Sequence, residues 1–145
     1  MYLVDTNILS AGAPARVAPP ALLAWMDVHS LALFLSAVTV AEIEDGITKA
    51  RREGATRKAT DLTAWLETVL HLYADRILAF DVPTARIAGA LSDRARGQGQ
   101  APGFADLIIA ATAHHHGLTI LSRNRKHFEP LSVSVLDPFA ALPPG

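Results

Sequence analysis

Cysteine is absent from the chain, and this absence and other shortages in its composition exclude several classes of protein. Without a thiol there is no disulfide framework, no thiolate zinc site and no cysteine nucleophile. The longest apolar runs, such as residues 31–35 and 107–111, are too short to span a bilayer. The formal net charge is −1, which does not favour a basic protein that coats nucleic acid. An enzyme that binds nucleic acid locally remains compatible with this charge, because bound cations would add positive charge.

The residues that are present predict one compact domain over residues 1–145. Hydrophobic residues make up 50% of the chain and charged residues 19%, which suits a folded core rather than a disordered tail. The sequence starts with the strand-like segment Tyr2–Val4 and lacks a basic region followed by an apolar one. We therefore expect no signal peptide, no membrane partner and a cytoplasmic location.

Short apolar segments alternate with longer segments of helical periodicity, and this alternation predicts the fold class. Helices are expected from Pro20, from near Thr39, from Thr56 to Tyr73, from Pro83, and from Ala105 to His115. The predicted strands are Tyr2–Val4, Ala32–Ser36, Ile77–Phe80, Leu118–Leu121 and Val133–Leu136. Strands separated by helices predict an α/β fold, a three-layer α/β/α arrangement around a mostly parallel five-stranded sheet. The two consecutive helices before Phe80 could instead form a hairpin that projects from this sheet.

Four oxygen-bearing side chains stand where predicted strands end or the next helices begin. Asp5 directly follows the first strand, and Glu42 and Asp106 are expected in the first turns of two helices. Asn124 follows the fourth strand by a few residues. Ligands of open α/β sheets bind beyond the carboxyl ends of the strands. The four side chains could therefore line one cleft.

Each of these residues also has a local explanation. Asp5 could cap the next helix, and Thr39 with Glu42 fits a capping box. Asp106 could complement the positive end of a helix dipole, and Asn124 could stabilise a turn. Each local explanation is common when a residue is taken singly. Their joint occurrence after successive strands favours a shared site.

A cluster of three carboxylates needs a cation or must take up a proton, because like charges repel. Carboxylate and amide oxygens without thiolates suit hard ions, so we expect Mg²⁺, with Mn²⁺ as a substitute. Such an ion supports phosphodiester hydrolysis by an activated water and offsets charge at the phosphorus. The sequence therefore predicts a metal site formed by Asp5, Glu42 and Asp106.

Four segments carry a resemblance to a known family across almost the whole chain. In order, they are YLVDTNILS (2–10), LSAVTVAEI (35–43), ADLIIAATA (105–113) and LSRNRKHF (121–128). They resemble PIN-domain proteins, most closely the VapC/FitB-like toxins of bacterial type II toxin–antitoxin pairs. This resemblance implies an endoribonuclease that hydrolyses RNA, with a PIN-like fold over residues 1–145.

The resemblance also assigns roles to single residues. It implies that Asp5, Glu42 and Asp106 are the metal-binding acids and that Asn124 occupies a fourth, usually acidic, position. Because Asn is neutral, one firmly held Mg²⁺ with a second ion recruited by substrate fits this set better than two permanent ions.

The neighbours of these acids could have supporting roles that follow from their positions, whereas the partners named below are what the resemblance implies. The hydroxyls of Thr6 and Ser122 could orient a water molecule or bond nearby backbone, and the backbone role is at least as good for Ser122. Arg123 and Arg125 flank Asn124 and are candidates for phosphate contacts. The expected partners are a cognate antitoxin, an RNA substrate and a second copy of the chain in a homodimer. The antitoxin is expected to dock on the helical hairpin.

Other interpretations of the same residues stay open. A catalytically weak binding module with a PIN scaffold would hold an antitoxin or RNA without cutting it, and the neutral Asn124 favours this alternative. A phosphoacceptor receiver domain is disfavoured because no pair of aspartates follows the first strand. The run His114–His116 suggests zinc, but consecutive helical residues point about 100° apart. Stabilisation of a helix end before Gly117 explains these histidines better.

Overall fold

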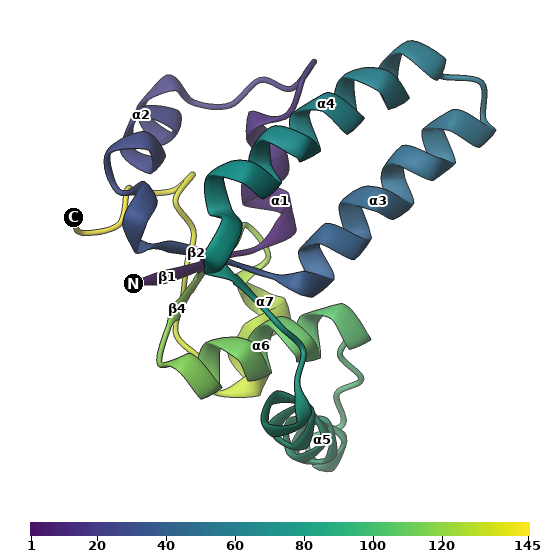
Figure 1. The fold of residues 1–145 in the computed structure, drawn as a ribbon. Helices are drawn as coiled ribbons and strands as arrows, with labels where there is room; N and C mark the ends of the chain where they lie inside the picture. The colour runs from purple at the N-terminus through teal and green to yellow at the C-terminus, as the bar shows by residue number, and fades with distance from the viewer.

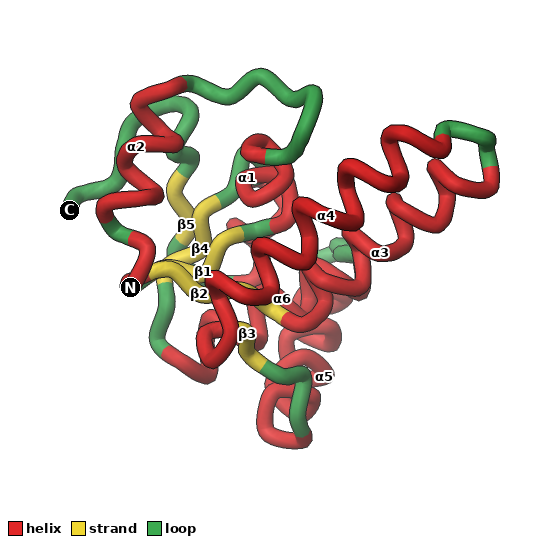
Figure 2. Tube along the Cα trace, turned by 45° about the horizontal axis from the view of Figure 1, so that its top comes forward, coloured by secondary structure: helices red, strands yellow, loops and turns green.

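The computed structural model describes all 145 residues and places five short parallel strands at the centre of the molecule (Figure 2). Their order across the sheet is β3-β2-β1-β4-β5, so β1 is the middle strand. Every neighbouring pair is parallel. The bounds are β1 (Tyr2–Val4), β2 (Leu33–Ser36), β3 (Ile77–Leu78), β4 (Thr119–Leu121) and β5 (Val135–Leu136).

Seven α-helices and four short 3₁₀ helices connect the strands and cover them (Figure 1). The α-helices are α1 (Thr6–Leu9), α2 (Pro20–Val28), α3 (Ala37–Arg52), α4 (Thr56–Tyr73), α5 (Val82–Gly97), α6 (Phe104–His116) and α7 (Arg125–Phe128). The 3₁₀ helices are Ser10–Gly12, Ser30–Ala32, Ala74–Arg76 and Glu129–Leu131. None of these helices combines the length and the apolar character that a membrane crossing needs.

Successive side chains along the strands belong to two hydrophobic cores, one on each face of the sheet. Val4 and Leu121 pack with residues of α1 to α4, whereas Leu3 and Ile120 pack with residues of α5, α6 and α7. Successive side chains of a strand point to opposite faces, so the central strands β1, β2 and β4 contribute to both cores. The expected three-layer α/β/α architecture is therefore confirmed, and the sheet is entirely parallel.

Helices α3 and α4 form a hairpin whose tip projects away from the sheet (Figure 1). Gly54 connects them with a φ of 81°, a backbone conformation that glycine adopts without steric cost. Along α4, Leu66 is buried, and Leu62 and Leu70 pack against the same core. The apolar stripe of α4 is therefore largely used within the chain.

One helix begins earlier than predicted, and this difference matters for the site. Helix α3 begins at Ala37 instead of near Thr39, because the Ser36 hydroxyl accepts a hydrogen bond from Val38 N and caps the helix. The proposed capping box of Thr39 and Glu42 is therefore absent. Glu42 lies beyond the first turn of α3, and its carboxylate does not cap the helix.

The third strand is also shorter than predicted. Pairing with β2 stops at Leu78, and Phe80 lies beyond the strand, where its ring meets Phe104 edge to face at 6.1 Å. Helix α6 matches the prediction closely. Every residue from Leu107 to Ala113 is buried, while His114–His116 form its exposed last turn before Gly117, which has a φ of 66°.

Candidate active site

Asp5 lies where the central strand ends, and its backbone still belongs to the sheet. Its amide donates a hydrogen bond to the carbonyl of Leu121 on β4 at 2.9 Å. Its side chain caps α1, because Oδ1 accepts from the Thr6 amide at 2.8 Å. Asp5 is only 5% exposed. The expected cap is thus present, and it holds a buried carboxylate at the carboxyl end of the sheet.

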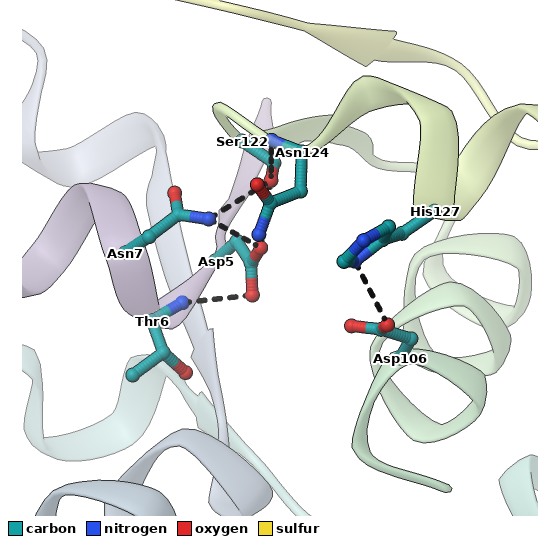
Figure 3. Close-up of polar contacts among 7 residues, drawn as sticks. All are labelled: Asp5, Thr6, Asn7, Asp106, Ser122, Asn124 and His127. Carbon is teal, nitrogen blue, oxygen red and sulfur yellow. Dashed lines mark hydrogen bonds and ion pairs between the residues drawn. The ribbon is translucent and has the colours of Figure 1, made fainter. Parts of the chain in front are cut away.

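The second oxygen of Asp5 receives two side-chain donors from distant parts of the chain. The Ser122 hydroxyl donates to Oδ2 at 2.7 Å, and the Asn7 amide donates to it at 3.2 Å (Figure 3). A carboxylate offers about four acceptor positions, of which these bonds and the Thr6 amide use three. The Asp5 carboxylate is therefore held in one orientation with an acceptor position left for a ligand.

Thr6 links Asp5 to Glu42. While its backbone amide bonds Asp5, its hydroxyl donates to Glu42 Oε1 at 2.7 Å. The same hydroxyl lies 3.0 Å from Oγ1 of the buried Thr39, which is able to donate to it. A single residue between β1 and α1 thus orients one carboxylate through its backbone and another through its side chain.

Asp106 stands in the first turn of α6, as predicted, and reaches the site from the opposite layer of the fold. Its Oδ2 lies 3.3 Å from Nδ1 of His127, which α7 supplies. Figure 3 shows the His127 ring over Asp106, with Asp5 on the other side of the site. The half-buried Asp106 carboxylate is therefore oriented by α7 rather than by the residues that hold Asp5.

A pocket of about 450 Å³ brings the predicted residues together. Asp5, Glu42, Asp106 and Asn124 all line it. The remaining lining residues are Thr6, Asn7, Ser10, Ala11, Arg16, Val17, Arg123 and Phe139. Side chains as far apart in the sequence as Asp5 and Asn124 therefore share one cavity, as the order of strands and helices predicted.

The electrostatics of this pocket are unfavourable to a buried carboxylate. Burial raises the pKa of Asp5 above its usual value of 3.8, and the negative charges of Asp106 and Glu42 raise it further. The hydrogen bonds from Ser122 and Thr6 act in the opposite direction without cancelling the increase. The pocket therefore concentrates negative charge that a cation would stabilise.

The donor set suits a hard cation, although the acids are not closed around one point. Three carboxylates and one amide line the pocket, the chain offers no thiol, and Asp5 keeps an acceptor position. No three Asp, Glu or His side chains lie close enough together to form a ready coordination sphere in this conformation. These residues fit Mg²⁺ or Mn²⁺ by the chemistry of their oxygen atoms.

The supporting residues were predicted with mixed success. The Ser122 hydroxyl contacts both a side chain and the backbone. It donates a hydrogen bond to the Asp5 carboxylate and accepts one from Asn124 N at 2.9 Å. Arg123 lines the pocket with its guanidinium 4.2 Å from the centroid of the Phe139 ring. Arg125 does not line this pocket and instead faces Glu129 at 3.8 Å on the surface. Asn124 lines the pocket, but its side chain caps no helix.

Four further residues at the site, Asn7, Arg16, His127 and Phe139, were not predicted from the sequence. Asn7 bonds Asp5, Ser122 and the Arg123 amide, and so ties α1 to the segment after β4. Asn7 and His127 stand inside the resembling segments, which was the available signal for them. Arg16 and Phe139 reach the pocket from irregular segments, where no periodic pattern indicates an orientation.

Known proteins resemble this chain over nearly its full length. The family model of the PIN domain matches residues 2–131, a range that includes Asp5, Glu42, Asp106 and Asn124. Toxin FitB of Neisseria gonorrhoeae is 37% identical over 142 residues, which cover 96% of this chain and 99% of that protein. The VapC ribonuclease Y4jK of Sinorhizobium fredii is 35% identical over 143 residues, covering 96% and 98%. The crystal structure of FitAcB from Neisseria gonorrhoeae contains a chain with a TM-score of 0.81 and 38% identity, covering 95% of this chain and 98% of that one.

Proposed function

The chain belongs to the PIN-domain family, with VapC and FitB toxins among its relatives, and we propose that it is an Mg²⁺-dependent endoribonuclease, the toxin of a type II toxin–antitoxin pair. One observation carries this proposal. Asp5, Glu42 and Asp106, from β1, α3 and α6, line one pocket in which Asp5 is buried with a raised pKa. Such a group of acids is costly to the apoprotein and useful to a phosphodiesterase that holds a divalent cation.

Each acid would hold the cation from a different element. Asp5 would offer the remaining acceptor position on Oδ1, Asp106 would offer the oxygen that His127 leaves free, and Glu42 would offer Oε2. Asn124 would contribute a neutral oxygen at the edge of the pocket, and Mn²⁺ would substitute for Mg²⁺. When bound, the ion supplies positive charge opposite the phosphate and lowers the pKa of a water molecule.

Neighbouring residues of the chain hold the carboxylates of the site in fixed orientations. Thr6 fixes Asp5 and Glu42 relative to each other, and Ser122 with Asn7 prevents rotation of the Asp5 carboxylate. Such supporting hydrogen bonds influence metal affinity and activity by about ten- to a hundredfold. Arg123, whose guanidinium lies over the Phe139 ring, provides positive charge at the pocket for the RNA phosphates.

We further propose that a cognate antitoxin protein binds the toxin and holds it inactive, that the protein is cytoplasmic, and that it forms a homodimer. The FitAcB crystal structure supports a protein partner by its name and its similarity to this chain. An apolar pocket of about 330 Å³ between α2 and α4 offers a surface for it and includes Leu23, Met26, Leu31 and Trp65. Dimerisation rests on the family resemblance alone.

A binding module without nuclease activity is the second candidate. The observation that favours it is the spacing of the acids, which form no ready coordination sphere, together with the neutral Asn124. This candidate predicts binding of RNA or antitoxin and no cleavage of any RNA with Mg²⁺ or Mn²⁺.

Cleavage of RNA by the purified protein distinguishes the two candidates. Total cellular RNA is incubated with the protein in Mg²⁺, in Mn²⁺ and in EDTA, and new RNA ends are mapped. We expect ends that require the metal and that disappear, with a rate loss of at least about a hundredfold, in Asp5→Asn and in Asp106→Asn. Asp93→Asn is the matched control, because Asp93 is an exposed acid on α5 outside the pocket, and it should cut like the unaltered protein.

Folding of each variant is checked by circular dichroism, so that loss of cleavage is not confused with loss of structure. Unchanged metal-dependent cleavage in both Asp5→Asn and Asp106→Asn would remove the proposed roles of these acids. Absence of cleavage in the unaltered protein, with RNA still bound, would instead support the binding module.

A further inference from the structure

A second pocket, of about 230 Å³, lies on the side of Asp106 that faces α7. Its polar lining comes from Gln100, Asp106, Lys126 and His127, with the backbone of Gly103. Asp106 is the residue that it shares with the pocket containing Asp5 and Glu42. The candidate nuclease site is therefore flanked by a cavity to which sequence analysis assigned nothing.

Residues 123–127, which we call the basic segment, connect these cavities. Arg123 and Asn124 line the pocket of Asp5, and Lys126 and His127 line the second pocket. A third cavity, of about 390 Å³, is lined by the whole basic segment and Glu129. The openings thus follow one another along five consecutive residues, of which three are Arg or Lys.

The basic side chains of this segment differ in the contacts that they already make within the protein. Arg125 faces Glu129 at 3.8 Å, and the Arg123 guanidinium lies over the Phe139 ring. His127 contacts Asp106. Lys126 is exposed, lines the second pocket and forms no ion pair. Its ammonium group is therefore the available point charge on this side of Asp106.

We propose that the second pocket binds an RNA phosphate adjacent to the scissile one, with Lys126 as its contact, so that the RNA strand crosses Asp106 between Arg123 and Lys126. This inference rests on the proposed nuclease function. An RNA strand cut internally carries phosphates on both sides of the scissile bond, and the acids alone would repel them. Lysine and arginine contacts to phosphates position a strand without reading its sequence. Gly103, the N-cap residue of α6, also lines this pocket, so the N-terminal end of the helix forms part of its wall.

Lys126 gives a cleaner test than His127, because removal of His127 would also release Asp106. The test uses Asp5→Asn as the parent, so that RNA stays intact during the measurement. A short fluorescein-labelled RNA of mixed sequence is titrated with the parent, with the parent carrying Lys126→Ala, and with the parent carrying Lys49→Ala. Lys49 is an exposed lysine in the last turn of α3 that lines none of these cavities. Fluorescence anisotropy is followed over a range of salt concentrations.

We expect Lys126→Ala to weaken RNA binding about fivefold and to reduce the slope of log affinity against log salt by about 0.7, the value for one phosphate contact on a single strand. Lys49→Ala should change neither quantity appreciably. Equal effects of the two substitutions, or none from Lys126→Ala, would overturn the phosphate assignment, as would a parent that binds no RNA.

The outcome is separable from that of the cleavage test. If the unaltered protein cuts RNA and Lys126→Ala binds it normally, the nuclease proposal stands and the phosphate pocket is wrong. If RNA is bound through Lys126 but never cut, the phosphate pocket stands and the nuclease proposal is wrong.

Discussion

Asp5 makes three kinds of structural interaction through its backbone and its side chain. Its amide completes the sheet ladder, one carboxylate oxygen caps α1, and the other accepts bonds from Ser122 and Asn7. Its two side-chain donors can also serve as acceptors, since a hydroxyl rotates and an amide flips. The position should therefore accept Asn at little structural cost, while the charge of Asp is retained for its chemistry.

This reasoning predicts how Asp5 affects stability as the pH changes in the absence of metal. An acid whose pKa is higher in the folded state binds its proton more tightly there, so folding loses stability as the pH rises through the range between the two values. For Asp5 this range begins at its usual value of 3.8 and extends upward to the raised value in the fold. We expect the free energy of unfolding of Asp5→Asn, measured with urea in EDTA, to equal or exceed that of the unaltered protein above this range.

The difference between the two proteins isolates Asp5 from the other acids. Asp81, for example, has a lowered pKa because the hydroxyl and amide of Thr84 bond its carboxylate, so its contribution is lost as the pH falls below 3.8. The substituted and unaltered proteins share that contribution, and it cancels in their difference. A substituted protein that is clearly less stable at neutral pH would show that the hydrogen bonds of Asp5 outweigh the cost of its charge.

At the scale of single residues, the strand and helix pattern was enough to locate polar residues that stand at element boundaries, and their roles stay predictions. Asp5 and Asp106 were found in this way, since their positions follow from the strand and helix pattern. Asn7 and His127 were missed because their roles depend on the approach of α1 to the segment after β4, and of α7 to α6. Asn7 and Ser122 are 115 residues apart, and no local pattern reports such a contact.

At the scale of elements, the hairpin of α3 and α4 contains two glycines with opposite conformational needs. Gly46 lies in the interior of α3 and Gly54 in the connection, where φ is 81°. A Cβ atom added at either position would meet nothing within 4 Å. Substitution by Ala therefore tests the backbone alone.

We expect Gly46→Ala to raise the free energy of unfolding by about 0.5–1 kcal/mol, because Ala loses less conformational freedom in a helix. Gly54→Ala should lower it by about 1–2 kcal/mol, the cost of a left-handed conformation with a Cβ atom. Urea unfolding at neutral pH measures the free energy of unfolding of both variants, and each variant serves as the control for the other. A stabilising Gly54→Ala would mean that the connection between α3 and α4 differs from the one described.

Element types followed from the sequence, whereas several element lengths did not. Apolar residues at strand ends suggested longer strands, but Phe80 leaves the sheet for Phe104, and Leu118 is buried without strand pairing. Helix α3 started earlier than expected because Ser36, the last residue of β2, also caps the helix. Hydrophobic patterns report burial, and burial continues past the point where pairing or helical geometry changes.

At the scale of the molecule, the acidic pocket joins the two helical layers across the end of the sheet. Glu42 belongs to α3 in one layer and Asp106 to α6 in the other, and Asp5 lies between them directly after β1. A cation held by all of them binds only the folded chain. A cation bound there should therefore link the two helical layers and stabilise the folded state.

We expect Mg²⁺ at a hundred times its dissociation constant to raise the free energy of unfolding by about 2.7 kcal/mol. The measurement is urea unfolding in Mg²⁺ and in EDTA at matched ionic strength. Asp106→Asn should lose most of this gain, because one of the layers no longer contributes a carboxylate. An equal gain in Asp106→Asn and in the unaltered protein would place the ion elsewhere.

The middle position of β1 has a consequence for the motion of the site. With β2 on one side and β4 on the other, the Asp5 amide, bonded to Leu121, is among those that should exchange with solvent only when the whole domain opens. Although Asp5 is the fifth residue of the chain, fraying of the residues before it is therefore not expected to displace its carboxylate from the pocket. The site should keep its negative charges in place as long as the sheet itself is intact.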